Sequence, residues 1–203
     1  MPAATAKAKK DGVVTATTPT LSTQMDIRTM TVRLVGDSPL VSHAWSQKAK
    51  QAMKDKQAKA PKQAKEVRDP NREYEESLYR MPDGSGYGFP AVAFKSAAVD
   101  ACSHVDGLTK VQARGAFHII GDMIRIDGTP HMREDMVRVG MGTADLRYRG
   151  EFTEWAVELE IRYNANVLSE AQIRNLFNVG GFAIGVGEWR PQRDGSWGMF
   201  HVE

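Results

Sequence analysis

The sequence is poor in cysteine: Cys102 is the only one among 203 residues. An intrachain disulfide is therefore impossible, which excludes the disulfide-stapled frameworks of small secreted domains and favours a reducing compartment. Cys102 lies on the apolar stripe of a predicted helix, so we expect it to pack as a small hydrophobic side chain.

Long apolar runs are also missing. No stretch approaches the roughly 20 apolar residues that a membrane-spanning helix needs, and the N-terminus lacks the continuous apolar core of a signal peptide. The sequence thus predicts a soluble, cytoplasmic protein without a membrane partner. Residues 1–25, rich in Ala, Thr and Lys, are predicted to form a disordered N-terminal arm.

Motifs for metals and nucleotide cofactors are lacking as well. None of the five histidines forms an H-x-x-x-H or H-E-x-x-H pair with another, so we expect no metal site. The sequence also has no G-x-x-x-x-G-K-[ST] phosphate loop. We therefore expect no bound cofactor.

What the sequence does have is a concentration of positive charge. Between Gln47 and Arg72 nine basic residues face three acids, although the whole chain carries a formal charge of only +2. Such a stretch suggests an anionic polymer as partner, and the alternative is a solvated Lys-rich helix with no partner. We select Lys54, Lys56 and Lys59 from this stretch as candidate nucleic-acid contacts.

Alternating apolar residues predict half-buried strands at 28–36 and 155–163. Residues 115–128 are predicted to form a strand pair or one strand bent around Gly121, and residues 136–140 a shorter strand. A last short strand is predicted at 196–202.

Three segments have helical character. Residues 44–60 are compatible with a helix that Pro61 stops. Together with the polar stretch that follows, up to residue 86, they are predicted to form a mobile basic insertion over 44–86. Pro90 stands at the start of a helix with a continuous apolar stripe. Ser169, with a glutamine three residues on, makes a capping box that starts another helix.

The order of these elements predicts an α+β fold with a ferredoxin-like (RRM-like) β-α-β-β-α-β core. We expect residues 26–203 to form one such domain.

The most informative segment runs from Gly180 to Gly198 and contains six glycines. Gly180 and its neighbour are expected to end the preceding helix. Glycine backbone can present consecutive N–H groups to a phosphate, arginine can grip it with two donors, and tryptophan can stack on unpaired bases. The candidate contacts in this segment are Gly185, Gly187, Trp189, Arg190, Arg193, Gly195 and Trp197. In the alternative interpretation, the glycines allow close helix–sheet packing and both tryptophans belong to the core.

The order of helix, glycine-rich loop and short terminal strand resembles the RAMP superfamily of CRISPR-associated RNA-binding proteins, in particular the backbone subunits along a guide RNA. Their I-P-G-S-S-L-K-G-A-L-R motif at the first core helix is similar to residues 89–99, FPAVAFKSAAV. The proline, the lysine and the small-residue face agree, whereas Ala91, Val92 and Ala93 replace the usual glycine and serines.

The resemblance implies that Lys95 and the glycine-rich loop face a single-stranded nucleic acid, RNA or DNA. It also implies head-to-tail assembly along the strand, as a homo-oligomer or within a multi-subunit ribonucleoprotein, with the insertion after the first strand acting as a thumb. We expect a non-catalytic subunit that binds the strand through its backbone.

Two other functions stay open. The first is a phage-type structural or assembly protein that uses the same surfaces for protein contacts. The second is a metal-independent endoribonuclease, for which His43, just past the first strand, is the only candidate catalytic residue because some RAMP proteins cut RNA with a histidine near the first helix. A turn or surface histidine is the simpler explanation of His43.

Overall fold

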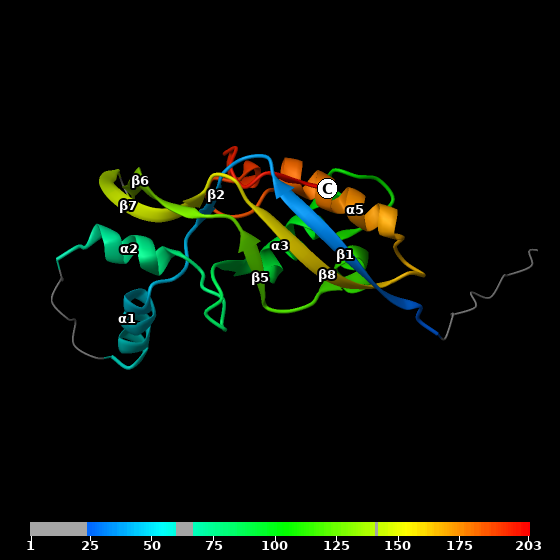
Figure 1. The fold of residues 1–203 in the computed structure, drawn as a ribbon, viewed down its shortest axis with the longest axis horizontal. Helices are drawn as coiled ribbons and strands as arrows, with labels where there is room; N and C mark the ends of the chain where they lie inside the picture. Colours follow the sequence, from blue (N-terminus) through cyan, green and yellow to red (C-terminus); the bar gives the residue numbers. More distant parts are fainter. Residues whose placement is uncertain (1–23, 60–66, 141) are drawn as a thin grey trace, which may run out of the picture.

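The computed structural model describes residues 24–59, 67–140 and 142–203 (Figure 1). Residues 1–23 of the predicted arm, and the part of the basic insertion with Lys62 and Lys65, lie outside the described residues. The strands are β1 (Ile27–Gly36), β2 (Leu40–Ser42), β3 (Gly88–Pro90), β4 (Phe117–Ile119), β5 (Met123–Asp127), β6 (Pro130–Val139), β7 (Thr143–Phe152), β8 (Ala156–Asn164) and β9 (Phe200–Val202). The helices are α1 (Gln47–Gln57), α2 (Pro70–Ser77), α3 (Ala91–Asp100), α4 (Lys110–Ala116) and α5 (Glu170–Ala183), with the short 3₁₀ turns η1 (Ala101–Ser103) and η2 (Pro191–Arg193).

The fold is mixed α+β with antiparallel sheets. The main sheet has the strand order β3-β5-β8-β1-β9, and β4 also pairs with β8. β1 and β8 run antiparallel in continuous register, from Ile27 opposite Asn164 to Val35 opposite Ala156. The predicted alternation in β1 is confirmed, because Met30, Val32 and Leu34 are buried.

Both long core helices pack on the same side of this sheet. Phe94 and Ala98 of α3 and Ile173 and Phe177 of α5 are buried in the same core cluster as the inward residues of β1 and β8. In Figure 1, α5 runs beside β1. The capping box at Ser169 is present and starts α5 as predicted.

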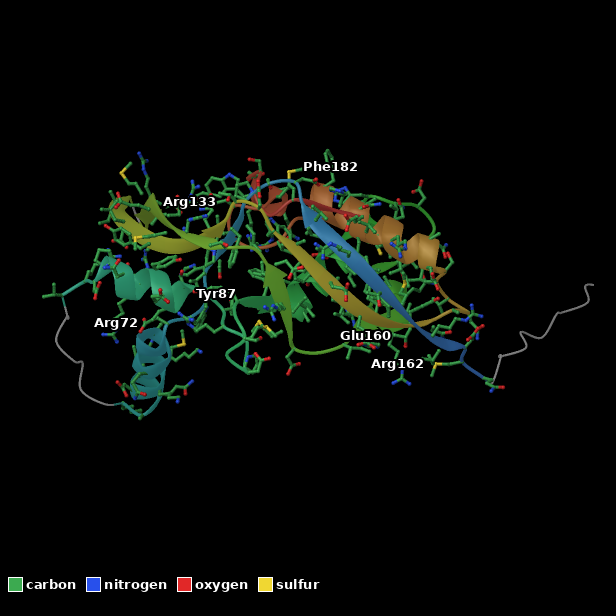
Figure 2. The ribbon with its side chains drawn as sticks, in the orientation of Figure 1. Arg72, Tyr87, Arg133, Glu160, Arg162 and Phe182 are labelled. Carbon is green, nitrogen blue, oxygen red and sulfur yellow. The ribbon has the colours of Figure 1, made fainter. Side chains whose placement is uncertain are left out.

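The opposite face of the sheet is open and polar. Thr31 lies opposite Glu160, and Thr29 lies opposite Arg162; Figure 2 labels this glutamate and arginine on β8. Within the described strands this face presents no Phe, Tyr or Trp side chain. RRM domains bind RNA by stacking bases on sheet aromatics, so this face does not offer that platform.

One helix end differs from the sequence prediction. Gly180 and Gly181 do not end α5, which continues to Ala183. A Cβ at Gly180 would lie 2.7 Å from the carbonyl oxygen of Ala97, and one at Gly181 would overlap the carbonyl oxygen of Phe200. These two glycines therefore allow α5 to approach α3 and β9 closely, and the irregular glycine-rich segment starts at Ile184.

A second sheet, of order β2-β7-β6, is built around a long hairpin. β6 pairs with β7 from Pro130 opposite Phe152 to Val139 opposite Thr143, a much longer strand than the one predicted at 136–140. α2 packs against β7, where Ser77 Oγ accepts the N–H of Gly150 at 2.8 Å. The region of the predicted insertion thus contributes two helices, α1 and α2. Among the described residues, no helix is long and apolar enough to cross a membrane.

Candidate nucleic-acid interface

A cleft of about 470 Å³ opens where the start of α3 meets the glycine-rich segment. Phe89, Pro90 and Val92 line it from the α3 side, and Gly185 and Gly187 line it from the segment. His43 and Tyr79 also line it. The two segments that sequence analysis singled out therefore line the same cleft.

The backbone of the glycine-rich segment is fixed by close contacts. Gly187 has a positive φ of 80°, and a Cβ there would lie 2.7 Å from the carbonyl oxygen of Val41. The next N–H, that of Glu188, donates to the same carbonyl at 3.1 Å. Trp189 has a φ of 55°, which is rare for a bulky residue. Gly195 packs directly on the Trp189 carbonyl and leaves no room for a side chain.

Arg190 lines the cleft, but its donors are used inside the segment. Its guanidinium donates to the Gly187 carbonyl at 3.0 Å and to Gln192 Oε1 at 3.2 and 3.1 Å. Gln192 in turn donates to Asp100 Oδ2 at 3.1 Å. Arg190 thereby braces the loop, and two carboxylates, Asp100 and Glu188, share the lining. Asp100 is also paired with Lys110 at 2.7 Å, so Glu188 is the carboxylate of the lining that disfavours a phosphate inside the cleft.

His43 and Glu188 form a pair at the cleft. His43 Nδ1 lies 3.1 Å from Glu188 Oε1, and the hydroxyl of Tyr79 donates to the His43 carbonyl at 3.5 Å. The hydrogen bond from His43 is the main reason that the pKa of Glu188 lies below its usual value, and the charges of Arg149 and Arg190 act in the same direction. Glu188 is thus ionised at neutral pH. Sequence analysis missed it, although it stands between Gly187 and Trp189.

The two tryptophans of the segment meet each other, and one of them is also covered. The rings of Trp189 and Trp197 meet edge to face at 6.2 Å, and the guanidinium of Arg133 lies 3.9 Å from the centre of the Trp197 ring. Arg133, labelled in Figure 2, comes from β6 and is held by Asp135 and Glu151 at 2.8 and 2.7 Å. Trp189 remains 42% exposed, so it is the ring that a base can reach.

Lys95 points to another part of the surface. Its Nζ lies 3.0 Å from Nδ1 of His118 and 5.8 Å from the centre of the Phe117 ring, both on β4. Burial, with a smaller contribution from the charge of Arg114, lowers the pKa of Lys95. Lys95 is not among the residues that line the cleft.

The basic stretch separates into paired arginines and unpaired lysines. Arg68 bonds to Glu73 and Asp145, and its pKa is raised chiefly by the hydrogen bond to Glu73. Four lysines of α1 and its C-terminal end are exposed and have no ion-pair partner within the described ranges. These residues are Lys50, Lys54, Lys56 and Lys59. Arg193, on η2, is likewise exposed and unpaired within those ranges.

α1 begins at Gln47, shortly after the cleft residue His43, and in Figure 1 it lies apart from the two sheets; none of the described residues that line the cleft is a lysine. Within the part of the chain that the structure describes, no three His, Cys, Asp or Glu side chains are grouped so that they could hold a metal ion.

No protein-family model matches this chain. No curated protein sequence matches it. Among solved structures, the crystal structure of Cmr6 from Pyrococcus furiosus is similar to it, with a TM-score of 0.44 and 8% sequence identity over 89% of this chain and 100% of that chain. A likeness of that degree carries no argument about the fold or the function of this chain.

Proposed function

We propose that this chain is a non-catalytic subunit that binds single-stranded nucleic acid and assembles along it, with a RAMP-like, ferredoxin-like core. The chain order β1, α3, β4–β5, β8, α5, β9 follows a β-α-β-β-α-β pattern. The sheet order β9-β1-β8-β5 puts the first and third core strands in the centre, which supports the ferredoxin-like assignment. The domain would span residues 26–203, with 44–86 as its insertion.

The observation that carries this proposal is the group of exposed, unpaired lysines on α1 and at its C-terminal end. α1 follows His43, which lines the cleft together with apolar residues, and the exposed Trp189 stands in the chain between the lining residues Glu188 and Arg190. We place the phosphates on Lys54, Lys56, Lys59 and Arg193, and unpaired bases on Trp189 and in the cleft. Cationic side chains for the backbone and aromatic faces for the bases are the usual combination in single-strand binding.

Anisotropy titration of a labelled single-stranded oligonucleotide at two salt concentrations tests the proposal. Affinity should fall steeply as salt rises. The triple variant Lys54→Gln, Lys56→Gln, Lys59→Gln should bind more weakly, and its slope of log K against log salt should be shallower by about 0.7 per lost phosphate contact. The control for loss of a positive charge elsewhere is Arg162→Gln, on the open face of the sheet.

Absence of binding at low salt would overturn the proposal. If the protein instead forms oligomers that contain no nucleic acid, the phage-type assembly function would replace it.

The His43–Glu188 pair favours metal-independent RNA cleavage as a second candidate function. Glu188 holds Nδ1 of His43, so Nε2 is the nitrogen left for proton transfer in the cleft. Incubation of labelled RNA with the protein and a chelator tests this candidate on a gel. His43→Ala should abolish cleavage while binding persists; if the unsubstituted protein leaves the RNA intact, the candidate fails.

A further inference from the structure

We propose that the cleft receives a guanine base of the bound strand and that the Glu188 carboxylate reads it. This inference rests on the proposed function and specifies its ligand. It starts from the charges of the lining. Asp100 is paired with Lys110, and Arg190 is bonded within its own segment. The Glu188 carboxylate is therefore the charged group of the lining with an oxygen left to accept N–H groups. The part of a strand that suits this cleft is therefore the edge of a base.

Glu188 is built into a rigid position. Its N–H is bonded to the Val41 carbonyl, and both of its neighbours, Gly187 and Trp189, have positive φ. Non-glycine residues in this conformation are costly and concentrate at functional sites. The strained backbone conformation at Trp189 therefore has a functional explanation. It places the side chain of Glu188 at the cleft and the ring of Trp189 at the surface.

The acceptor pattern of Glu188 selects among the bases. The carboxylate is ionised, so it can only accept, and His43 contacts Oε1 while Oε2 has no bonded partner in the described structure. Guanine presents two adjacent donors, N1–H and the N2 amino group, to a carboxylate. Adenine and cytosine present one amino donor beside a ring acceptor, and uracil presents one N–H between two carbonyls. Glu188 thus matches guanine best.

The walls of the cleft suit the faces of a base. Tyr79 packs edge to face on Phe89 with ring centres 5.5 Å apart, and Pro90 and Val92 add apolar surface. Val92 is exposed although it stands at the start of a core helix. Unpaired bases in proteins are held by such aromatic and apolar contacts and are identified by hydrogen bonds along the Watson–Crick edge.

The test compares three oligoadenylate strands that differ at one central position: guanine, inosine, which lacks the N2 amino group, or adenine. We expect the guanine strand to bind about tenfold tighter than the adenine strand, because a discriminating base contact is of that order. The inosine strand should fall between them. In Glu188→Gln the guanine-to-adenine affinity ratio should drop towards one. Glu160→Gln, on the open face of the sheet, should keep the wild-type ratio.

The outcomes separate the inference from the proposed function. Equal binding of the three strands by the unsubstituted protein overturns guanine reading and leaves strand binding intact. An unchanged ratio in Glu188→Gln, with a guanine preference in the unsubstituted protein, overturns the role of Glu188. If no strand binds, both fail, and a cleft that takes an amine or guanidinium of a protein partner becomes the explanation for its acidic lining. The inosine comparison needs no variant, so it holds even if Glu188→Gln folds poorly.

Discussion

At Gly181 the absence of a side chain sets how closely α5 approaches β9. A Cβ there would overlap the Phe200 carbonyl, so Gly181→Ala must push the helix from the sheet. We expect a loss of about 1–3 kcal/mol in unfolding free energy, the usual cost of overpacking. Urea unfolding measures it. Gly115→Ala in α4 is the control, because nothing lies within 4 Å of its Cβ; it should leave stability unchanged or raise it by up to about 1 kcal/mol. Equal stability of the Gly181→Ala variant and the unsubstituted protein would contradict the packing argument.

At the scale of the element, α5 depends on its capping box. Ser169 Oγ accepts the N–H of Gln172 at 3.3 Å, and Gln172 Oε1 accepts the N–H of Ser169 at 2.9 Å. Ser169→Ala should cost about 0.5–2 kcal/mol of unfolding free energy because an N–H at the helix start loses its acceptor. Ser169→Asp supplies another acceptor and should keep most of the stability. Comparison of the unfolding curves of the two variants shows whether stability is lost because the cap's acceptor is missing or because serine itself is replaced.

The elements that sequence analysis predicted well are those with one buried face. In β1 and β8 the alternation of apolar and polar residues marks that face directly, as at Val32 and Leu159. The start of α5 follows from Ser169 and Gln172 alone. The class of fold, mixed α+β, could therefore be read from local patterns.

Most of the hairpin β6–β7, beyond the short strand predicted at 136–140, was not predicted, because its charges hide any alternation. Arg133 pairs with Glu151 across the two strands, and Asp135 pairs with Arg149, so charged residues hold the hairpin together and no apolar alternation marks these strands. α2 does begin with the recognisable pair Asp69 and Pro70, but it has no apolar stripe because it buries little beyond Ser77.

For the candidate site, the two segments that sequence analysis selected line one cleft, but not every selected residue lines it. Pro90, Gly185 and Gly187 share a cleft. Both segments were predicted to lie at ends of core elements, which is why the sequence could indicate that they meet. Lys95 does not join them because the rotation of α3 is set by its packing, which turns Lys95 towards β4. Glu188 was missed because sequence analysis expected an anionic ligand, and a carboxylate repels anions.

At the scale of the whole molecule, we expect assembly to depend on the strand. Both sheets leave edge strands unpaired within the described chain, including β9 and the long β6, and unpaired edges are available to a neighbouring copy. Sedimentation with single-stranded oligonucleotides of increasing length should show mass rising in steps of one protomer. A mass that does not change with oligonucleotide length would contradict assembly along the strand.

The uneven burial of the tryptophans has an optical consequence. Trp155 is 4% exposed and donates its indole N–H to the Ser38 carbonyl, whereas Trp45 and Trp189 are largely open to solvent. Trp155 should emit at shorter wavelength than the other two and be shielded from quenchers in solution. A base stacked on Trp189 would quench the emission at longer wavelength only. Unfolding would expose Trp155 and shift its shorter-wavelength emission to longer wavelength. One emission spectrum of the unlabelled protein can therefore report the binding of a strand and the folded state of the protein separately.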